Sequence, residues 1–193
     1  MKTSLLPSLI CPSCHSGSLK AISFGKKSQD ISLGILLCTC RQWYLIEDGI
    51  LELLTLDLNQ DRRASFYANN IRHFKKLRLL ASKKISSRTS RQASKIHQSH
   101  FFDSFSEHYV LETQPFWQAY YRRSLHSFTQ LLHSHSLILD VGCGNGLSSL
   151  PLLRQGHTVI GADISRQMIK DAIFKSQHSK AHYLVADAEN LPF

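Results

Sequence analysis

Apolar runs and turn residues divide the chain into three zones, the first of which covers residues 1 to about 57. Here short apolar runs at residues 34–38 and 43–46 predict strands, and the Asp48-Gly49 pair that follows predicts a turn. A further apolar run at residues 51–54 is compatible with another strand or with a bridge to the next zone. The pattern predicts a small β module at the amino end.

The second zone, residues 58 to about 100, is basic and rich in serine. A loose helical stripe of apolar residues predicts a connecting helix and linker: Ile71, Phe74, Leu77, Leu79 and Leu80. Residues 62–98 contain eleven Lys or Arg and no Asp or Glu. Such a segment can follow an RNA backbone, but it is equally compatible with a solvated linker, because aromatic residues are sparse and no RNA-binding motif is present.

The third zone, residues 101–193, begins with a helical pattern and then alternates strand and helix. The pattern predicts strands at residues 137–141, 158–162 and 181–186, with helices at about 147–155 and 165–177. Ser165 is a candidate N-cap of the second helix. The βαβαβ order predicts an α/β fold with a parallel, Rossmann-like sheet, in which ligands bind at the carboxyl ends of the strands.

Composition limits the class of protein. The chain has 193 residues, of which 42% are hydrophobic, so it can form one ordinary domain and a small one. Its net charge of +9 is compatible with a polyanionic partner. No apolar run approaches the ~18 residues that span a bilayer, and Pro7 interrupts the short apolar start, which lacks a signal-peptide cleavage site. We therefore expect a cytoplasmic protein without membrane insertion.

Four of the five cysteines occur in two close pairs, Cys11 with Cys14 and Cys38 with Cys40. A module as small as the first zone buries only a small hydrophobic core and usually needs further stabilisation, such as a bound metal ion or disulfides. Four thiolates that converge from two loops match the tetrahedral coordination of Zn²⁺. His15 is a lower-ranked substitute ligand, and four free thiols are the alternative.

A glycine loop follows the strand at residues 137–141, with Gly142, Gly144 and Gly146 on alternate positions after Asp140. Because glycine lacks a Cβ, the loop backbone can lie directly against a ligand. A dinucleotide fingerprint, G-x-G-x-x-G, would place its third glycine where Leu147 stands. Asp140 would also repel a pyrophosphate, whereas it suits the ammonium and sulfonium of S-adenosylmethionine. The loop therefore favours S-adenosylmethionine.

Acidic residues also end the next two strands. Asp163 lies where an acidic side chain can accept hydrogen bonds from the ribose hydroxyls of an adenosine, as it also would in an NAD site. Asp187 is placed to accept from the adenine amino group. Any single one of these carboxylates could be a solvated strand end. Three in succession beside a glycine loop indicate a binding site.

Residues 137–193 resemble the first half of a class I S-adenosylmethionine-dependent methyltransferase of the broad type 11 group. The family patterns L-D-V-G-C-G-x-G, G-x-D-x-S-x-x-M-I-x-x-A and D-A-E-x-L-P-F match residues 139–146, 161–172 and 187–193. Residues 102–109 resemble a fourth pattern, F-D-x-x-A-x-x-Y, with Ser106 in place of alanine.

The resemblance implies roles for individual residues. Asp140, Gly142, Gly144 and Gly146 would hold the methionine moiety, with Cys143 as a small residue of the same loop rather than a nucleophile. The remaining contacts implied are Asp163 and Ile164 at the ribose, Met168 near the adenosine, Asp187 and Ala188 around the adenine, and Tyr109 at the methionine end.

The first zone resembles the zinc-ribbon proteins and fused amino-terminal domains that accompany methyltransferases. Their Y-P-I-x-D-G-I-P-x-L-L ending corresponds to residues 44–54, which lack both prolines. The resemblance implies that Cys11, Cys14, Cys38 and Cys40 bind zinc.

In the family a fourth strand follows soon after the third pattern. We therefore expect a truncated domain that is weakly active or inactive, with unknown catalytic residues and an RNA or small-molecule acceptor. The strand at residues 137–141 would then be an exposed edge that invites self-association. The alternative function is a non-enzymatic zinc-ribbon and basic binding module with a vestigial half-domain.

Overall fold

A computed structural model describes residues 1–193 except 17, 26–29, 83–84, 107–114 and 177–179. The chain folds into two compact units. The first unit comprises Met1–His97 together with Glu189–Phe193, and the second comprises Gln98–Ala188. None of the helices in the described ranges is both long and apolar enough to cross a membrane.

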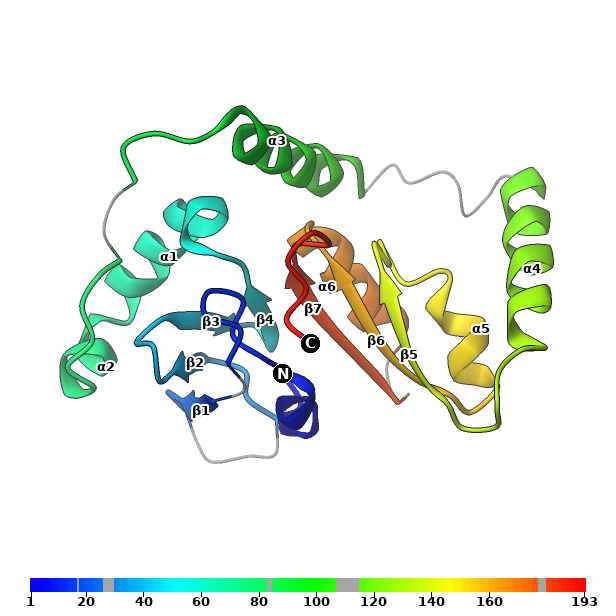
Figure 1. Cartoon of the computed structure of the whole chain (residues 1–193), viewed down its shortest axis with the longest axis horizontal. Coiled ribbons are helices and arrows are strands. Elements are labelled where there is room, and N and C mark those ends of the chain that lie inside the picture. Colours follow the sequence, from blue (N-terminus) through cyan, green and yellow to red (C-terminus); the bar gives the residue numbers. More distant parts are fainter. Residues whose placement is uncertain (17, 26–29, 83–84, 107–114, 177–179) are drawn as a thin grey trace. The chain divides into compact units, whose positions relative to one another are not determined.

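The first unit is built on antiparallel strands in the order β1-β2-β3-β4 (Figure 1). Their bounds are β1 Leu19–Ser23, β2 Gly34–Cys38, β3 Trp43–Glu47 and β4 Ile50–Leu53, preceded by a 3-10 helix, η1, at Thr3–Ser8. Glu47 pairs with Ile50 across a two-residue turn. Asp48 and Gly49 have φ of 54° and 77°, the left-handed backbone that a type I′ hairpin requires. The predicted strands and turn are confirmed.

Two helices, α1 (Leu56–Asn69) and α2 (Ile71–Lys76), follow the strands and complete the core of the first unit. Phe66 of α1 and Phe74 of α2 pack edge to face, with ring centroids 6.1 Å apart. Both belong to a buried cluster with Ile35, Trp43, Leu45 and Leu79. Part of the segment that the sequence assigns to a basic linker and helix therefore lies in this core.

The second unit contains parallel strands in the order β7-β6-β5. Its elements are α4 Pro115–Thr129, β5 Leu137–Val141, α5 Ser149–Arg154, β6 Thr158–Asp163, α6 Arg166–Lys175 and β7 Ala181–Ala186, preceded by α3 at Ser90–Phe105, which begins in the first unit. The three strands confirm the predicted α/β fold. Ser165 caps α6 as expected, because its Oγ accepts a hydrogen bond from the Met168 amide at 3.1 Å.

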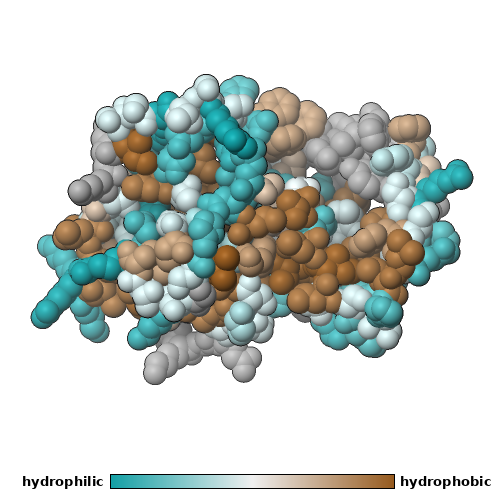
Figure 2. Space-filling view, viewed as in Figure 1, coloured by the Kyte–Doolittle hydropathy of each residue, from teal (hydrophilic) through white to brown (hydrophobic). Residues whose placement is uncertain are grey.

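β5 is paired with β6 alone among the described strands. The side chains of Leu137, Leu139 and Val141 are 64%, 42% and 43% exposed. Figure 2 shows hydrophobic side chains gathered over β5–β7 on the face in view. The exposed apolar edge that the sequence predicts is present.

Candidate functional site

The glycine loop turns back on the end of β6. The amides of Gly142 and Cys143 both donate to the Ala162 carbonyl, at 2.8 and 3.2 Å. Gly142, Gly144 and Gly146 have φ of 70°, 51° and 79°, so each adopts a conformation that favours glycine.

The loop glycines differ in what surrounds them. A Cβ on Gly142 or Gly144 would meet no atom within 4 Å, whereas one on Gly146 would lie 3.0 Å from the Ala172 Cβ. Gly146 is therefore needed for packing on α6. The first two glycines leave open space beside the loop, and a ligand can lie there against the backbone.

Asp140 lies near the carboxyl end of β5 and accepts two hydroxyl hydrogen bonds. Its Oδ2 receives the Ser148 Oγ at 2.8 Å and the Ser149 Oγ at 2.6 Å. These bonds hold the carboxylate at the start of the glycine loop, where the sequence predicts a contact with a cationic ligand.

Asp163, the last residue of β6, ties the glycine loop to the start of α6. Its Oδ2 accepts from the Gly144 amide at 2.9 Å, and its Oδ1 accepts from the Ser165 amide at 2.8 Å. Burial raises the pKa of this carboxyl, although the backbone donors oppose the shift. Each carboxylate oxygen has a second lone pair, so ribose hydroxyls can still donate to it.

The three acids lie at or next to the carboxyl ends of neighbouring parallel strands. Asp140 is in register with Gly161, and Asp163 is in register with Val185, two residues before Asp187. Asp187 itself is buried, at 8% exposure. The structure therefore brings Asp140, Asp163 and Asp187 together at the carboxyl ends of the three strands, as the strand order predicts.

The other predicted site residues lie in different surroundings. Met168 is 2% exposed and packs inside the second unit, and Ala188 is exposed after β7. Tyr109 lies outside the described residues. Cys143 is buried, and burial with the charges of Asp140 and Asp163 raises the pKa of its thiol, which favours a neutral packing residue over a nucleophile.

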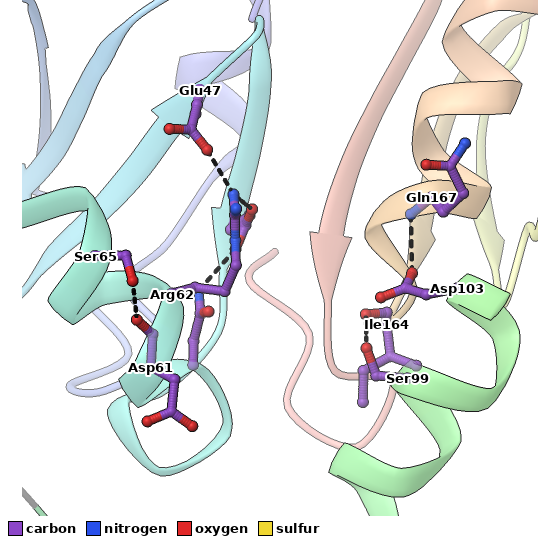
Figure 3. Close-up of polar contacts among 10 residues, drawn as sticks. Glu47, Asp61, Arg62, Ser65, Ser99, Asp103, Ile164 and Gln167 are labelled. Carbon is purple, nitrogen blue, oxygen red and sulfur yellow. Dashed lines mark hydrogen bonds and ion pairs between the residues drawn. The ribbon is translucent and has the colours of Figure 1, made fainter. Parts of the chain in front are cut away.

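Sequence reasoning missed the contact between α3 and the loop after β6. Asp103 Oδ1 accepts from the Gln167 amide at 3.0 Å, and the Ser99 Oγ donates to the Ile164 carbonyl at 3.1 Å (Figure 3). Asp103 Oδ1 also accepts from the Ser165 Oγ, at 2.6 Å. All of these residues belong to the second unit. Asp103 lies in residues 102–109, which resemble the family pattern F-D-x-x-A-x-x-Y. That resemblance is the feature of the sequence from which a role for Asp103 could have been predicted.

The four paired cysteines of the first unit converge. All four Sγ atoms lie within 4.8 Å of one another, with 3.7 Å between Cys11 and Cys40 and 3.5 Å between Cys14 and Cys38. Four sulfurs around a tetrahedral Zn²⁺ with bonds of about 2.3 Å would lie about 3.8 Å apart. The cluster has nearly that spacing, and His15 is not part of it.

Neighbouring donors surround the thiol cluster. The Tyr44 hydroxyl lies 3.0 Å from the Cys11 Sγ, and the Cys40 amide donates to the Cys38 Sγ at 3.5 Å. Burial acts to raise the pKa of Cys38, but hydrogen bonds from Cys40 and the other thiols bring it down to about 7. The pKa of Cys40 rises to about 12, mainly because of burial. One thiol is therefore predisposed to act as a thiolate.

Several cations of residues 62–98 pair with acids inside the first unit. Arg62 contacts Glu47 at 2.8 Å and Glu52 at 2.7 Å (Figure 3). Arg91 and Lys95 both contact Glu189, at 2.7 and 2.5 Å. Exposed cations are concentrated on and after α2: Arg72, Lys75, Lys76 and Arg78.

Residues 138–193 match a family model described as a methyltransferase domain. Three relatives match over short stretches. The ubiquinone biosynthesis O-methyltransferase of Pelagibacter ubique is 45% identical over 56 residues, 28% of this chain and 23% of that protein. The 18S rRNA (guanine-N(7))-methyltransferase of Schizosaccharomyces pombe is 42% identical over 59 residues, 30% of this chain and 22% of that protein.

The third relative, the tRNA (carboxymethyluridine(34)-5-O)-methyltransferase of Arabidopsis thaliana, is 45% identical over 67 residues, 35% of this chain and 15% of that protein. Among solved structures, a SAM-dependent methyltransferase from Methanosarcina mazei has 32% identity and a TM-score of 0.33, covering 34% of this chain and 35% of that chain. The chain spans less than a quarter of the length of these three curated relatives.

Proposed function

Residues 138–193 are related to the methyltransferase domains of S-adenosylmethionine-dependent enzymes, and from this premise we propose that the chain belongs to a class I methyltransferase. One observation carries the proposal. Beside Gly142 and Gly144 the glycine loop has open space, and Asp140 and Asp163 lie at the ends of the strands that flank it.

The residues of this site fit S-adenosylmethionine, which supplies a methyl group on a positively charged sulfur. Backbone at Gly142 and Gly144 can approach the methionine moiety, and the Asp140 carboxylate favours its ammonium. Asp163 can accept from the ribose hydroxyls while its amide donors hold it in position. The site thus binds and orients the methyl donor.

Calorimetric titration of the chain with S-adenosylmethionine tests this proposal. We expect saturable binding that Asp163→Asn weakens about tenfold, since a charge-assisted hydrogen bond is worth about 1.5–3 kcal/mol. Arg154→Ala, an exposed change on α5, is the matched control. Preferential binding of NAD⁺, or no binding of S-adenosylmethionine by folded protein, would contradict the proposal.

We further propose RNA as the methyl acceptor. The exposed cations on and after α2 support it, as do the RNA methyltransferases among the relatives, although others are named for small-molecule acceptors. RNA affinity should fall steeply as the salt concentration rises. The double variant Lys75→Ala with Lys76→Ala should reduce the slope of log affinity against log salt concentration by about two. Salt-independent binding, or methylation of small molecules alone, would count against RNA.

We also propose that Cys11, Cys14, Cys38 and Cys40 hold a structural Zn²⁺. Their spacing supports it, and ligand thiols fit a reducing compartment such as the cytoplasm. Cobalt(II) titration should give the absorption of tetrahedral thiolate coordination. Cys38→Ser should remove that spectrum, while Cys143→Ser, which changes the cysteine outside the cluster, should leave it unchanged. Octahedral spectra would contradict the proposal.

A further inference from the structure

The four sulfurs of the thiol cluster differ in their access to water and to hydrogen-bond donors. Cys14 and Cys40 are exposed, so water can reach them. Cys38 is buried, and the Cys40 amide donates to its Sγ at 3.5 Å. Cys11 is the most deeply buried, at 0% exposure, and the Tyr44 hydroxyl lies 3.0 Å from its Sγ. A buried sulfur that carries negative charge needs a donor in place of water, and Tyr44 can supply it.

The hairpin of β2 and β3 holds Tyr44 beside the cluster. Tyr44 is the second residue of β3 and pairs with Leu36 of β2, the strand that ends at Cys38. Its side chain is buried, with an exposed fraction of 1%. Because strand pairing and burial already fix the ring, little side-chain entropy is lost when the hydroxyl donates to a bound ligand.

Ser13 extends this contact to the protein surface. Ser13 is exposed, and its Oγ lies 2.8 Å from the Tyr44 hydroxyl. A phenol has one proton to donate. When Cys11 is an unprotonated metal ligand, Tyr44 donates that proton to the sulfur, so Ser13 must donate to the Tyr44 oxygen. The charge of the ligand thus fixes the direction of both hydrogen bonds.

We propose that Tyr44 is a positioning residue of the metal site, which stabilises Cys11 as a thiolate ligand, and that Ser13 acts through Tyr44. This inference rests on the proposed Zn²⁺ site and assigns the residues that support one of its ligands. Four thiolates around one Zn²⁺ carry excess negative charge, and a hydrogen bond to a sulfur disperses part of it. Hydrogen-bond partners of metal ligands commonly contribute about 10–100-fold to metal affinity.

Metal binding by Tyr44→Phe in the full chain tests this role. Competition with a chelator should show Zn²⁺ affinity reduced at least about tenfold, because Cys11 loses its donor while the aromatic ring remains. Tyr67→Phe is the matched control. It removes the same hydroxyl from a ring that packs on Phe74 in the same unit, and it should leave the affinity unchanged. Unchanged affinity in Tyr44→Phe, or an equal loss in both variants, overturns the proposal.

The cobalt(II) spectrum separates this role from a purely structural one. A hydrogen bond lowers the energy of the sulfur lone pairs, so charge transfer from Cys11 to cobalt requires more energy. In Tyr44→Phe the thiolate-to-cobalt band should therefore move to longer wavelength, while the visible bands remain tetrahedral. A wild-type tetrahedral spectrum that Tyr44→Phe leaves unmoved overturns the role of Tyr44 alone. A wild type without that spectrum overturns the Zn²⁺ site and this role with it.

Ser13→Ala provides a second test at an exposed position. It should reduce Zn²⁺ affinity about threefold and move the cobalt band in the same direction by a smaller amount. In a Tyr44→Phe background it should have no further effect, because Ser13 acts through the Tyr44 hydroxyl. Additive effects overturn the proposed order of the hydrogen bonds. If Tyr44→Phe does not fold, Ser13→Ala decides the question, and an unmoved band with unchanged affinity overturns the proposal.

Discussion

Gly161 lies in β6, and because it has no side chain, Cys143 of the glycine loop and Tyr183 of β7 can pack against its backbone. A Cβ at this position would lie 2.4 Å from the Tyr183 Cδ1 and 2.9 Å from the Cys143 Sγ. Gly161 thus links the loop that carries Cys143 to the neighbouring strand. The requirement comes from steric fit alone, since its backbone φ is outside the left-handed region.

We expect Gly161→Ala to destabilise the protein by about 1–3 kcal/mol, because an added methyl in a filled interior forces its neighbours apart. Denaturant unfolding measures the loss. Gly25→Ala is the control, since a Cβ at Gly25 would meet nothing within 4 Å. Equal effects of the two changes would contradict this packing argument.

The thiol cluster should bind metal more tightly as pH rises. The pKa of Cys38 is about 7 and that of Cys40 about 12, so at neutral pH a bound metal ion must displace the proton of Cys40 and part of that of Cys38. Lowering the pH from about 8 to about 6 protonates Cys38 as well and should reduce the affinity of the cluster for Zn²⁺ at least tenfold. Competition with a chelator at both pH values measures this, and a pH-independent affinity would contradict it.

The cysteine cluster could be predicted from the types and spacing of its residues, whereas the burial of Arg63 could not. The spacing of Cys11, Cys14, Cys38 and Cys40 predicts a cluster because two close cysteine pairs in a small module are typical of a zinc site. Arg63 belongs to the basic segment 62–98, and a pattern of charges carries no information about which cation becomes buried. Its environment depends on Trp43, which packs over it in the folded protein.

At the scale of elements, short apolar runs between turn residues proved sufficient to locate β2, β3 and β5–β7. β1 was missed because it is only half-buried and contains Lys20, so it lacks a continuous apolar pattern. α1 was also missed. Its buried side chains are Asn59, Arg63 and Phe66, and two of these three are polar. Tertiary packing, not hydrophobic periodicity, gives this helix its place.

Asp103 connects α3 to the start of α6, and its removal should loosen that contact. Asp103→Ala deprives the Gln167 amide and the Ser165 hydroxyl of their acceptor, which we expect to cost about 1.5–3 kcal/mol locally. Hydrogen exchange at the Gln167 amide should accelerate. Ser104→Ala is the control, because the Ser104 Oγ donates within its own helix to the Phe101 carbonyl. An unchanged exchange rate of the Gln167 amide in Asp103→Ala would show that Asp103 does not stabilise the contact between α3 and α6.

At the scale of the whole molecule, each compact unit carries its own chemistry. The first unit holds the thiol cluster, and the second holds the glycine loop and the acids at the strand ends. The order of strands and helices predicted the second site, because parallel strands bring their carboxyl ends together. A hollow beside Trp43 and Arg63 was not predictable, since its walls come from residues 41–43, α1 and residues 79–82.

We propose that the exposed edge of β5 allows copies of the chain to associate. A charge on an edge strand opposes such pairing, so Leu139→Lys should shift sedimentation toward the monomer at high protein concentration. Leu131→Lys, at a residue 81% exposed outside the strand, is the control and should not shift it. A wild-type chain that stays monomeric at all concentrations would contradict the proposal.

The central claim, that the glycine loop is an S-adenosylmethionine site, is tested most directly by NMR. The chain has nine glycines, so selective ¹⁵N-glycine labelling gives a spectrum simple enough to assign by single substitutions. We predict that S-adenosylmethionine shifts the amide signals of Gly142 and Gly144 strongly, while Gly25 and Gly34 in the first unit do not move. Saturable binding that leaves Gly142 and Gly144 unshifted would contradict the account.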